Sequence, residues 1–228
     1  MRIRGKLIAV VAALTVWGAD AISATTQDEP RKADAPACWQ QGQGALRVLI
    51  AYASDSGHTA ALAREVAAGA ATVAGACVWA ADVAGLRPDV VVGADAIILG
   101  SPVHNSNPAA RLLAWVEQWP FRDAPLRDKV GAAFVTAGGI SAGEELTQVA
   151  LLHAMLEFGM VVAGGADWQA AFGAAAISGE APLTASGVGE AAAQHFAAKA
   201  RGLGARVATL ARRLHPATVA PVSSIAPH

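Results

Sequence analysis

The sequence predicts a doubly wound α/β sandwich of five parallel strands, with helices on both faces of the sheet. Short apolar runs alternate with segments of helical periodicity between residues 46 and 214. The strand runs are apolar throughout instead of alternating with polar residues, which indicates a parallel sheet covered on both faces. Five strand–helix units of this kind make one three-layer domain.

Each element of this domain has its own signal in the sequence. Leu62, Val66 and Ala70 recur at helical spacing, and Trp115 and Trp119 fall on the inward stripe of another helix, where we interpret them as packing residues while Arg111 can face outward. The expected strands are 46–52, 77–80, 96–100, 130–135 and 160–162, and the expected helices are 59–73, 108–119, 144–158 and 188–214.

Composition and charge exclude two classes of protein. The chain has 228 residues with 17 Lys plus Arg against 18 Asp plus Glu, and this balance argues against a nucleic-acid binder, which would carry a basic stripe. The mean hydropathy of +0.39 raises the question of a membrane protein. Much of it comes from alanine, however, and the apolar stretches after residue 20 are soon broken by charge or glycine. Because a bilayer span needs about 20 apolar residues, we expect no transmembrane domain after the N-terminal segment.

The first 21 residues are typical of a Sec-type signal peptide. A basic start with Arg2, Arg4 and Lys6 precedes an apolar run over 7–17, and the small residues of 19–21 offer a cleavage site. We therefore expect export to the periplasm. The alternatives are an uncleaved anchor, or a cytoplasmic protein whose N-terminus is misassigned. Residues 22–45 are polar and punctuated by proline and glycine, and predict an extended leader; residues 215–228 predict a flexible tail.

The loop 54–59 is the most informative segment of the chain. It joins a buried strand to the start of a helix, where unpaired N–H groups and the helix dipole favour an anion. Gly57 lets the backbone approach a ligand closely, and three hydroxyls add donors. The alternative is an ordinary helix start capped by Asp55 or Ser56. The Walker motif and GxGxxG are both absent, which excludes the nucleoside triphosphate and Rossmann dinucleotide interpretations.

Several segments together resemble the flavodoxin-like superfamily, in order along the chain. The run 48–59 resembles its FMN phosphate loop, and the branch to which the chain is most similar is the NAD(P)H:quinone oxidoreductases once described as tryptophan-repressor-binding proteins. The resemblance covers 46–214 and implies a flavodoxin-like three-layer sandwich. Its further segments are 95–103, 134–139 with 143–147, 158–162, and 172–174.

The resemblance implies three groups of FMN contacts. One loop would cradle the phosphate, a second would run along the isoalloxazine edge, and a third would supply N–H groups near the pyrimidine end, where they favour the reduced anionic flavin. The hydride chemistry belongs to the cofactor, so no protein nucleophile is needed. The residues are, in that order, Ser54, Asp55, Ser56, Gly57, His58 and Thr59; Pro102, Val103, His104 and Asn105; and Thr136, Ala137, Gly138 and Gly139.

The chain also departs from its relatives at three places. They usually carry an aromatic residue where this chain has Asn105, and a histidine near the end of the helix where it has Glu157 and Phe158. The segment 164–172 is shorter than in the quinone reductases, where this region helps to build the nicotinamide and quinone pocket and the tetramer. The resemblance therefore predicts FMN binding more firmly than a substrate or a homo-oligomer.

The function that follows is two-electron reduction of a quinone by NAD(P)H in a ping-pong hydride mechanism. His104 is the candidate catalytic acid; the alternative is a solvated loop histidine. A second function is an exported flavodoxin-type electron carrier, although such carriers are usually strongly acidic and this chain is near neutral. A third is an FMN-binding domain without NAD(P)H activity, since NAD(P)H is scarce outside the cytoplasm.

Three other kinds of residue have two interpretations each. Trp168 and Phe172 either stack on a ring in the pocket or close the core. Glu144 and its neighbour Glu145 stabilise a helix dipole in preference to acting as bases. Cys38 and Cys77 either form a disulfide that ties the leader to the second strand, an edge strand, or stay reduced. The sequence has no CxxC motif and no metal-ligand cluster.

Overall fold

The computed structural model describes residues 33–40, 45–179 and 189–215, with the side chains of 189–192 excepted. The expected signal peptide at 1–21, most of the leader and the tail beyond His215 lie outside these ranges. None of the helices within them is long and apolar enough to cross a bilayer.

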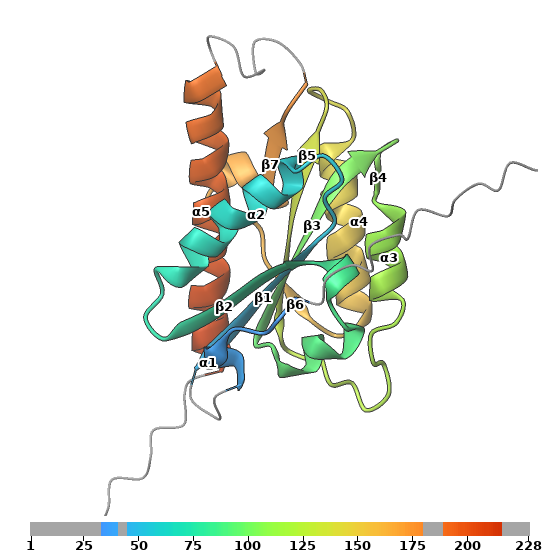
Figure 1. Cartoon of the computed structure of the whole chain (residues 1–228), viewed down its shortest axis with the longest axis vertical. Coiled ribbons are helices and arrows are strands. Elements are labelled where there is room, and N and C mark those ends of the chain that lie inside the picture. The colour runs from blue at the N-terminus through green and yellow to red at the C-terminus, as the bar shows by residue number, and fades with distance from the viewer. Residues whose placement is uncertain (1–32, 41–44, 180–188, 216–228) are drawn as a thin grey trace, which may run out of the picture.

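A parallel sheet forms the middle layer, as the apolar strand runs predict (Figure 1). β1 (Leu46–Tyr52) lies between β2 (Ala76–Asp82) and β3 (Ala96–His104), and β3 pairs with β5 (Val130–Ala137). The full order is β2-β1-β3-β5-β6, so β2 is an edge strand. The chain reverses its direction across the sheet between β1 and β3, and doubly wound proteins bind ligands outside the carboxyl ends of the strands at such a point.

The fifth strand position is divided between two short strands, of which the sequence predicted only the first. β6 (Val161–Val162) pairs with the start of β5, and β7 (Ala174–Ile177) pairs with its end. β7 was missed because its sequence is three alanines and one isoleucine, and alanine is depleted in strands. A further two-residue strand, β4 (Asn107–Pro108), runs antiparallel to the end of β3.

Two helices cover each face of the sheet (Figure 1). α2 (His58–Ala71) and α5 (Gly189–Leu214) pack on one face, while α3 (Ala110–Val116) and α4 (Glu144–Glu157) pack on the other. The prediction of helices on both faces is thus confirmed.

The helix α3 ends three residues before its predicted end. Trp119 precedes Pro120, and a residue before proline disfavours helical backbone, so the chain turns after Val116. Trp115 and Trp119 are each 4% exposed, with their rings edge-on at 5.5 Å, which confirms that they are packing residues. The short 3-10 helices are η1 (Val83–Gly85), η2 (Pro88–Gly93) and η3 (Trp168–Ala170).

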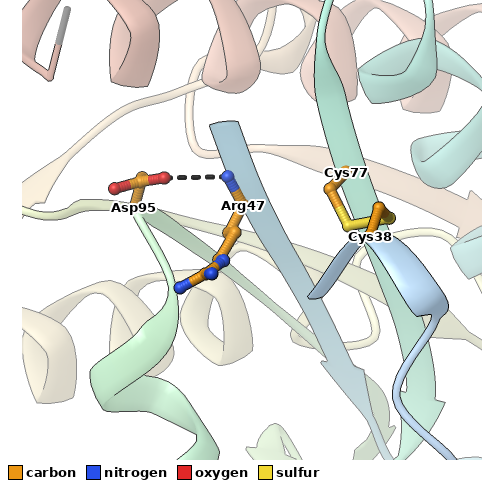
Figure 2. The surroundings of a disulfide bond; sticks show 4 residues. All are labelled: Cys38, Arg47, Cys77 and Asp95. Carbon is orange, nitrogen blue, oxygen red and sulfur yellow. Dashed lines mark hydrogen bonds between the residues drawn. A yellow bond between two sulfur atoms is a disulfide. The ribbon is translucent and has the colours of Figure 1, made fainter. Parts of the chain in front are cut away.

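The leader is held against the edge strand by a disulfide (Figure 2). Cys38 lies in the single-turn helix α1 (Ala37–Gln40), and its sulfur is bonded to that of the buried Cys77 in β2. Trp39 beside it packs edge-on against Trp79 of the same strand, with ring centroids 5.3 Å apart. The disulfide hypothesis is therefore the one that the structure supports.

Replacing Cys38 and Cys77 together by serine will lower the free energy of unfolding by up to about 4 kcal/mol, the chain-entropy value for a cross-link between residues 39 apart. Urea unfolding followed by tryptophan fluorescence measures this difference. Dithiothreitol should lower the midpoint of the unmodified protein and leave that of the double variant unchanged. Equal midpoints for the unmodified protein and the double variant would show that the bridge adds no stability.

Candidate functional site

The first loop of the site is an open cluster of backbone N–H groups at the start of α2. Gly57 occupies the N-cap position with φ +88°, so the N-cap residue itself has no side chain that could accept an N–H group of the helix. Within the described part of the chain, the N–H groups of residues 55–59 donate to no acceptor. The hypothesis of a helix start capped by Asp55 or Ser56 is therefore wrong, and the loop has the donors and the dipole of an anion site.

Hydrogen bonds at both ends of this loop fix its position without using the N–H groups of residues 55–59. The Ser54 N–H donates to Asp82 Oδ2 at 3.0 Å, and Ser54 Oγ accepts the N–H of Ala60 at 3.1 Å. At the other end, the hydroxyls of Thr59 and Thr136 are 2.8 Å apart and buried. The last bond joins the first loop to the end of β5, so the phosphate-loop and third-loop residues of the prediction lie together.

The second loop is a tight hairpin at the end of β3. Asn105 and Ser106 have φ +50° and +63°, which is the backbone of a two-residue hairpin turn, and His104 pairs with Asn107 across it. The Ser101 hydroxyl accepts the N–H of Ala109 at 2.8 Å and closes the base of the hairpin. Pro102, Val103, His104 and Asn105 of the prediction therefore lie along one rigid ribbon.

The third loop contacts this hairpin directly. It follows the buried Thr136 and Ala137, and the N–H groups of Gly138 and Gly139 have no acceptor among the described residues. Its last residue, Gly143, has φ +97°, and a Cβ added there would lie 2.6 Å from the Cα of Ser106. The second and third loops thus meet at a point that only glycine fits.

The helix after the third loop begins as the sequence predicted. Glu144 opens α4, and its Oε1 accepts the N–H of Ser141 at 3.0 Å. This carboxylate therefore caps the loop and stabilises the helix dipole.

A charged cluster that the sequence did not predict lies beside the first loop. Arg111, at the start of α3, donates two hydrogen bonds to the Asp82 carboxylate, and its Nη2 lies 3.2 Å from Asp55 Oδ1. His104 Nε2 lies 3.9 Å from Asp55 Oδ2. The bond to Asp82 raises the pKa of the Arg111 guanidinium, and both carboxylates attract its charge.

The expectation that Arg111 faces outward is wrong, because its side chain is only 34% exposed and turns toward Asp82. The available signal was Asp82 itself, a carboxylate at the end of a strand run, since the carboxyl ends of parallel strands meet at one edge of the sheet. No three His, Cys, Asp or Glu side chains in the described ranges are grouped to hold a metal ion.

Two pockets lie near the third loop. One, of about 330 Å³, opens between the starts of α2 and α5, and Thr136 and Ile177 line it. The other, of about 220 Å³, lies between α4 and the segment 168–173. Trp168 and Phe172 at its rim are 84% and 41% exposed, so the alternative that they close the core is wrong.

Known proteins match large parts of this chain. The family model described as NADPH-dependent FMN reductase matches residues 81–175. An NAD(P)H dehydrogenase (quinone) of Azorhizobium caulinodans is 34% identical over 142 residues, which are 52% of this chain and 70% of that protein. The chain belongs to the family of these quinone dehydrogenases. A family member from Afipia carboxidovorans is 28% identical over 74% of this chain and 98% of its own length.

A solved structure shows the same fold as this quinone dehydrogenase relative. The flavodoxin described as a WrbA-like protein from Agrobacterium tumefaciens has a TM-score of 0.56 and 23% identity, and it matches 74% of this chain and 99% of that one. The flavodoxin-like sandwich predicted from the sequence is thereby confirmed. The individual FMN contacts of the three loops stay predictions, as does the role of His104.

Replacing Gly143 by alanine will lower the free energy of unfolding by about 2 kcal/mol, because alanine is strained at positive φ and its Cβ meets Ser106. Urea unfolding measures the loss. Gly138→Ala is the matched control, since a Cβ there meets no atom within 4 Å and the backbone φ is not in the positive region. If both variants unfold at the same urea concentration, the hairpin does not depend on this contact.

Proposed function

We propose that this family member is an FMN-dependent oxidoreductase that transfers two electrons from NAD(P)H to a quinone. The observation that carries the proposal is the row of N–H groups at residues 55–59, which have no acceptor within the described ranges and lie at the start of a helix on the carboxyl edge of the sheet. A phosphate monoester fits this row because it presents several oxygens, each able to accept more than one hydrogen bond.

The residues that would hold FMN form a continuous edge. Residues 54–59 would bind the phosphate, the hairpin strand 102–105 would flank the ring, and 136–139 would offer N–H groups to its pyrimidine oxygens. The contact between Ser106 and Gly143 joins the last two segments, so they would bind the ring as one unit.

Bound FMN would supply the chemistry of hydride acceptance and two-electron transfer. NAD(P)H loses the hydride and leaves as NAD(P)⁺, after which the quinone takes two electrons and two protons, one of them from solvent, to become the quinol. The protein binds and orients both partners in turn, which is the ping-pong order. The N–H groups of Gly138 and Gly139 would stabilise negative charge on the reduced ring.

The purified protein should bind FMN and turn over NADH or NADPH repeatedly only when a quinone is present. Titration of FMN fluorescence gives the dissociation constant, and the initial rates should give parallel double-reciprocal lines. Binding of FMN with no turnover of either nucleotide would favour the electron carrier, or the binding domain without NAD(P)H activity.

Variants at Gly57 test the phosphate loop itself. Gly57→Asp should weaken FMN binding on the order of tenfold or more, because it places a carboxylate among the N–H groups that hold the phosphate. Gly57→Asn is the matched control: it has the same shape and backbone strain and no charge. If the two variants bind FMN with equal affinity, the phosphate does not bind at this loop.

We propose further that the protein is exported and folds in an oxidising compartment. The basic and apolar start of the chain supports this, and so does the Cys38–Cys77 disulfide, because such bonds are rare in reducing compartments. Mass spectrometry of the periplasmic fraction should find a chain that begins at Ile22 and has no free thiol. A cytoplasmic chain that retains Met1 and two free thiols would contradict the proposal. Self-association stays a prediction, which the elution volume of the FMN-loaded protein tests.

A further inference from the structure

We propose that Arg111 is a positioning residue for the FMN phosphate: it holds the Asp55 carboxylate away from the N–H groups of residues 55–59. The inference rests on the proposed FMN binding and concerns how this chain binds an anion with an acidic residue inside its own anion loop.

Asp55 is an acidic residue within the anion loop itself. It follows Ser54 at the entry of the loop, and its own N–H is the first of the free donors. The carboxylate of a short side chain such as aspartate readily accepts hydrogen bonds from nearby backbone N–H groups, as it does at helix caps. In this position it would compete with a phosphate for the same donors and repel its charge.

An ion pair with Arg111 prevents this competition. Asp55 Oδ1 lies 3.2 Å from Arg111 Nη2, and its other oxygen, Oδ2, faces His104. The two carboxylate oxygens are therefore turned toward the start of α3 and the end of β3. Among the described residues the N–H groups of residues 55–59 have no acceptor, and the Asp55 carboxylate does not cap α2.

Arg111 is itself held in place by Asp82. Its guanidinium is fixed by two hydrogen bonds to Asp82, which also accepts the N–H groups of Ser54 and Ala84. The side chains of Arg111 and Asp82 are 34% and 31% exposed, whereas those of the Arg87–Asp89 pair are 78% and 58% exposed. A half-buried guanidinium with two hydrogen bonds to one carboxylate keeps a fixed orientation far better than the guanidinium of an exposed ion pair does.

The charge of the loop makes the position of the Asp55 carboxylate important. Residues 53–59 contain no Lys or Arg, so the loop depends on N–H groups and hydroxyls to balance a phosphate. A carboxylate released by the loss of Arg111 would remain close to the bound phosphate with no cation between them. The affinity for FMN would then fall, while that for riboflavin, which has no phosphate, would not.

The test compares FMN and riboflavin binding to Arg111→Met, Asp55→Asn and the double variant. Arg111→Met should weaken FMN binding roughly tenfold and leave riboflavin binding within about twofold. Adding Asp55→Asn should restore the FMN affinity to within about threefold of the unmodified protein, because the repelling charge is gone. Arg87→Met, which removes an exposed pair, is the matched control and should change neither affinity.

The outcomes separate this inference from the proposed function. If the unmodified protein binds no FMN, the proposed function fails. If it binds FMN and Arg111→Met binds it equally well, or loses FMN and riboflavin affinity together without rescue by Asp55→Asn, the positioning role is overturned. If the Arg111→Met variant does not fold, Arg111→Lys takes its place, because lysine keeps the positive charge and loses the paired hydrogen bonds of the guanidinium to Asp82. It should give a smaller FMN-specific loss that Asp55→Asn again removes, and the absence of both effects would overturn the inference.

Discussion

The candidate site depends on the carboxylate of Asp82, the last residue of β2. It accepts the N–H groups of Ser54 and Ala84 and two hydrogen bonds from Arg111, and so connects β2, the first loop and α3. A carboxylate with this many donors is bound firmly in one orientation, because each bond restricts the others. The start of the anion loop therefore has a fixed position before any ligand arrives, and a preorganised site loses little entropy on binding. The three loops are held together in the same way by Thr59 with Thr136 and by Ser106 against Gly143.

An anion site made of N–H groups works under a different constraint from one made of lysines or arginines. A cation attracts an anion over some distance and tolerates misplacement, whereas N–H dipoles act only at hydrogen-bond range and in the right direction. Such a loop must keep its donors free of protein acceptors, its backbone in a conformation that only glycine adopts easily, and its acidic residue turned away. The free N–H groups, the φ of +88° at Gly57 and the ion pair of Asp55 meet these three conditions. The near-neutral charge of the chain is consistent with a site of this kind.

The sequence predicted the parts of the fold that depend on local pattern. Strands such as 46–52 and 96–100 are continuous apolar runs, and their order follows from the winding rules of parallel sheets. It could not predict β7, whose alanines have no strand preference and which is a strand only because β5 offers a free edge. The contact of Arg111 could not be predicted for a similar reason. Helical periodicity places Arg111 on the polar face of its helix, and only the tertiary fold brings Asp82 at the end of β2 beside it. Trp168 lies in the connection between the short strands β6 and β7, and the course of this connection leaves its side chain exposed. The sequence pattern could not predict that course, because it did not predict β7.

The disulfide and the site act on the same strand, and this connects the stability of the fold to the geometry of the loop. In the part of the chain that the structure describes, β2 pairs with β1 alone, and an edge strand is among the first parts of a sheet to open. Cys77 lies near the start of β2 and Asp82 at its end, with Trp79 between them packed against Trp39 of the leader. The leader thus covers the strand that carries the central carboxylate of the site. An opening of β2 would release Asp82 and, with it, both Ser54 and Arg111, so a covalent clamp on this edge also preserves the open N–H groups at the far end of the strand.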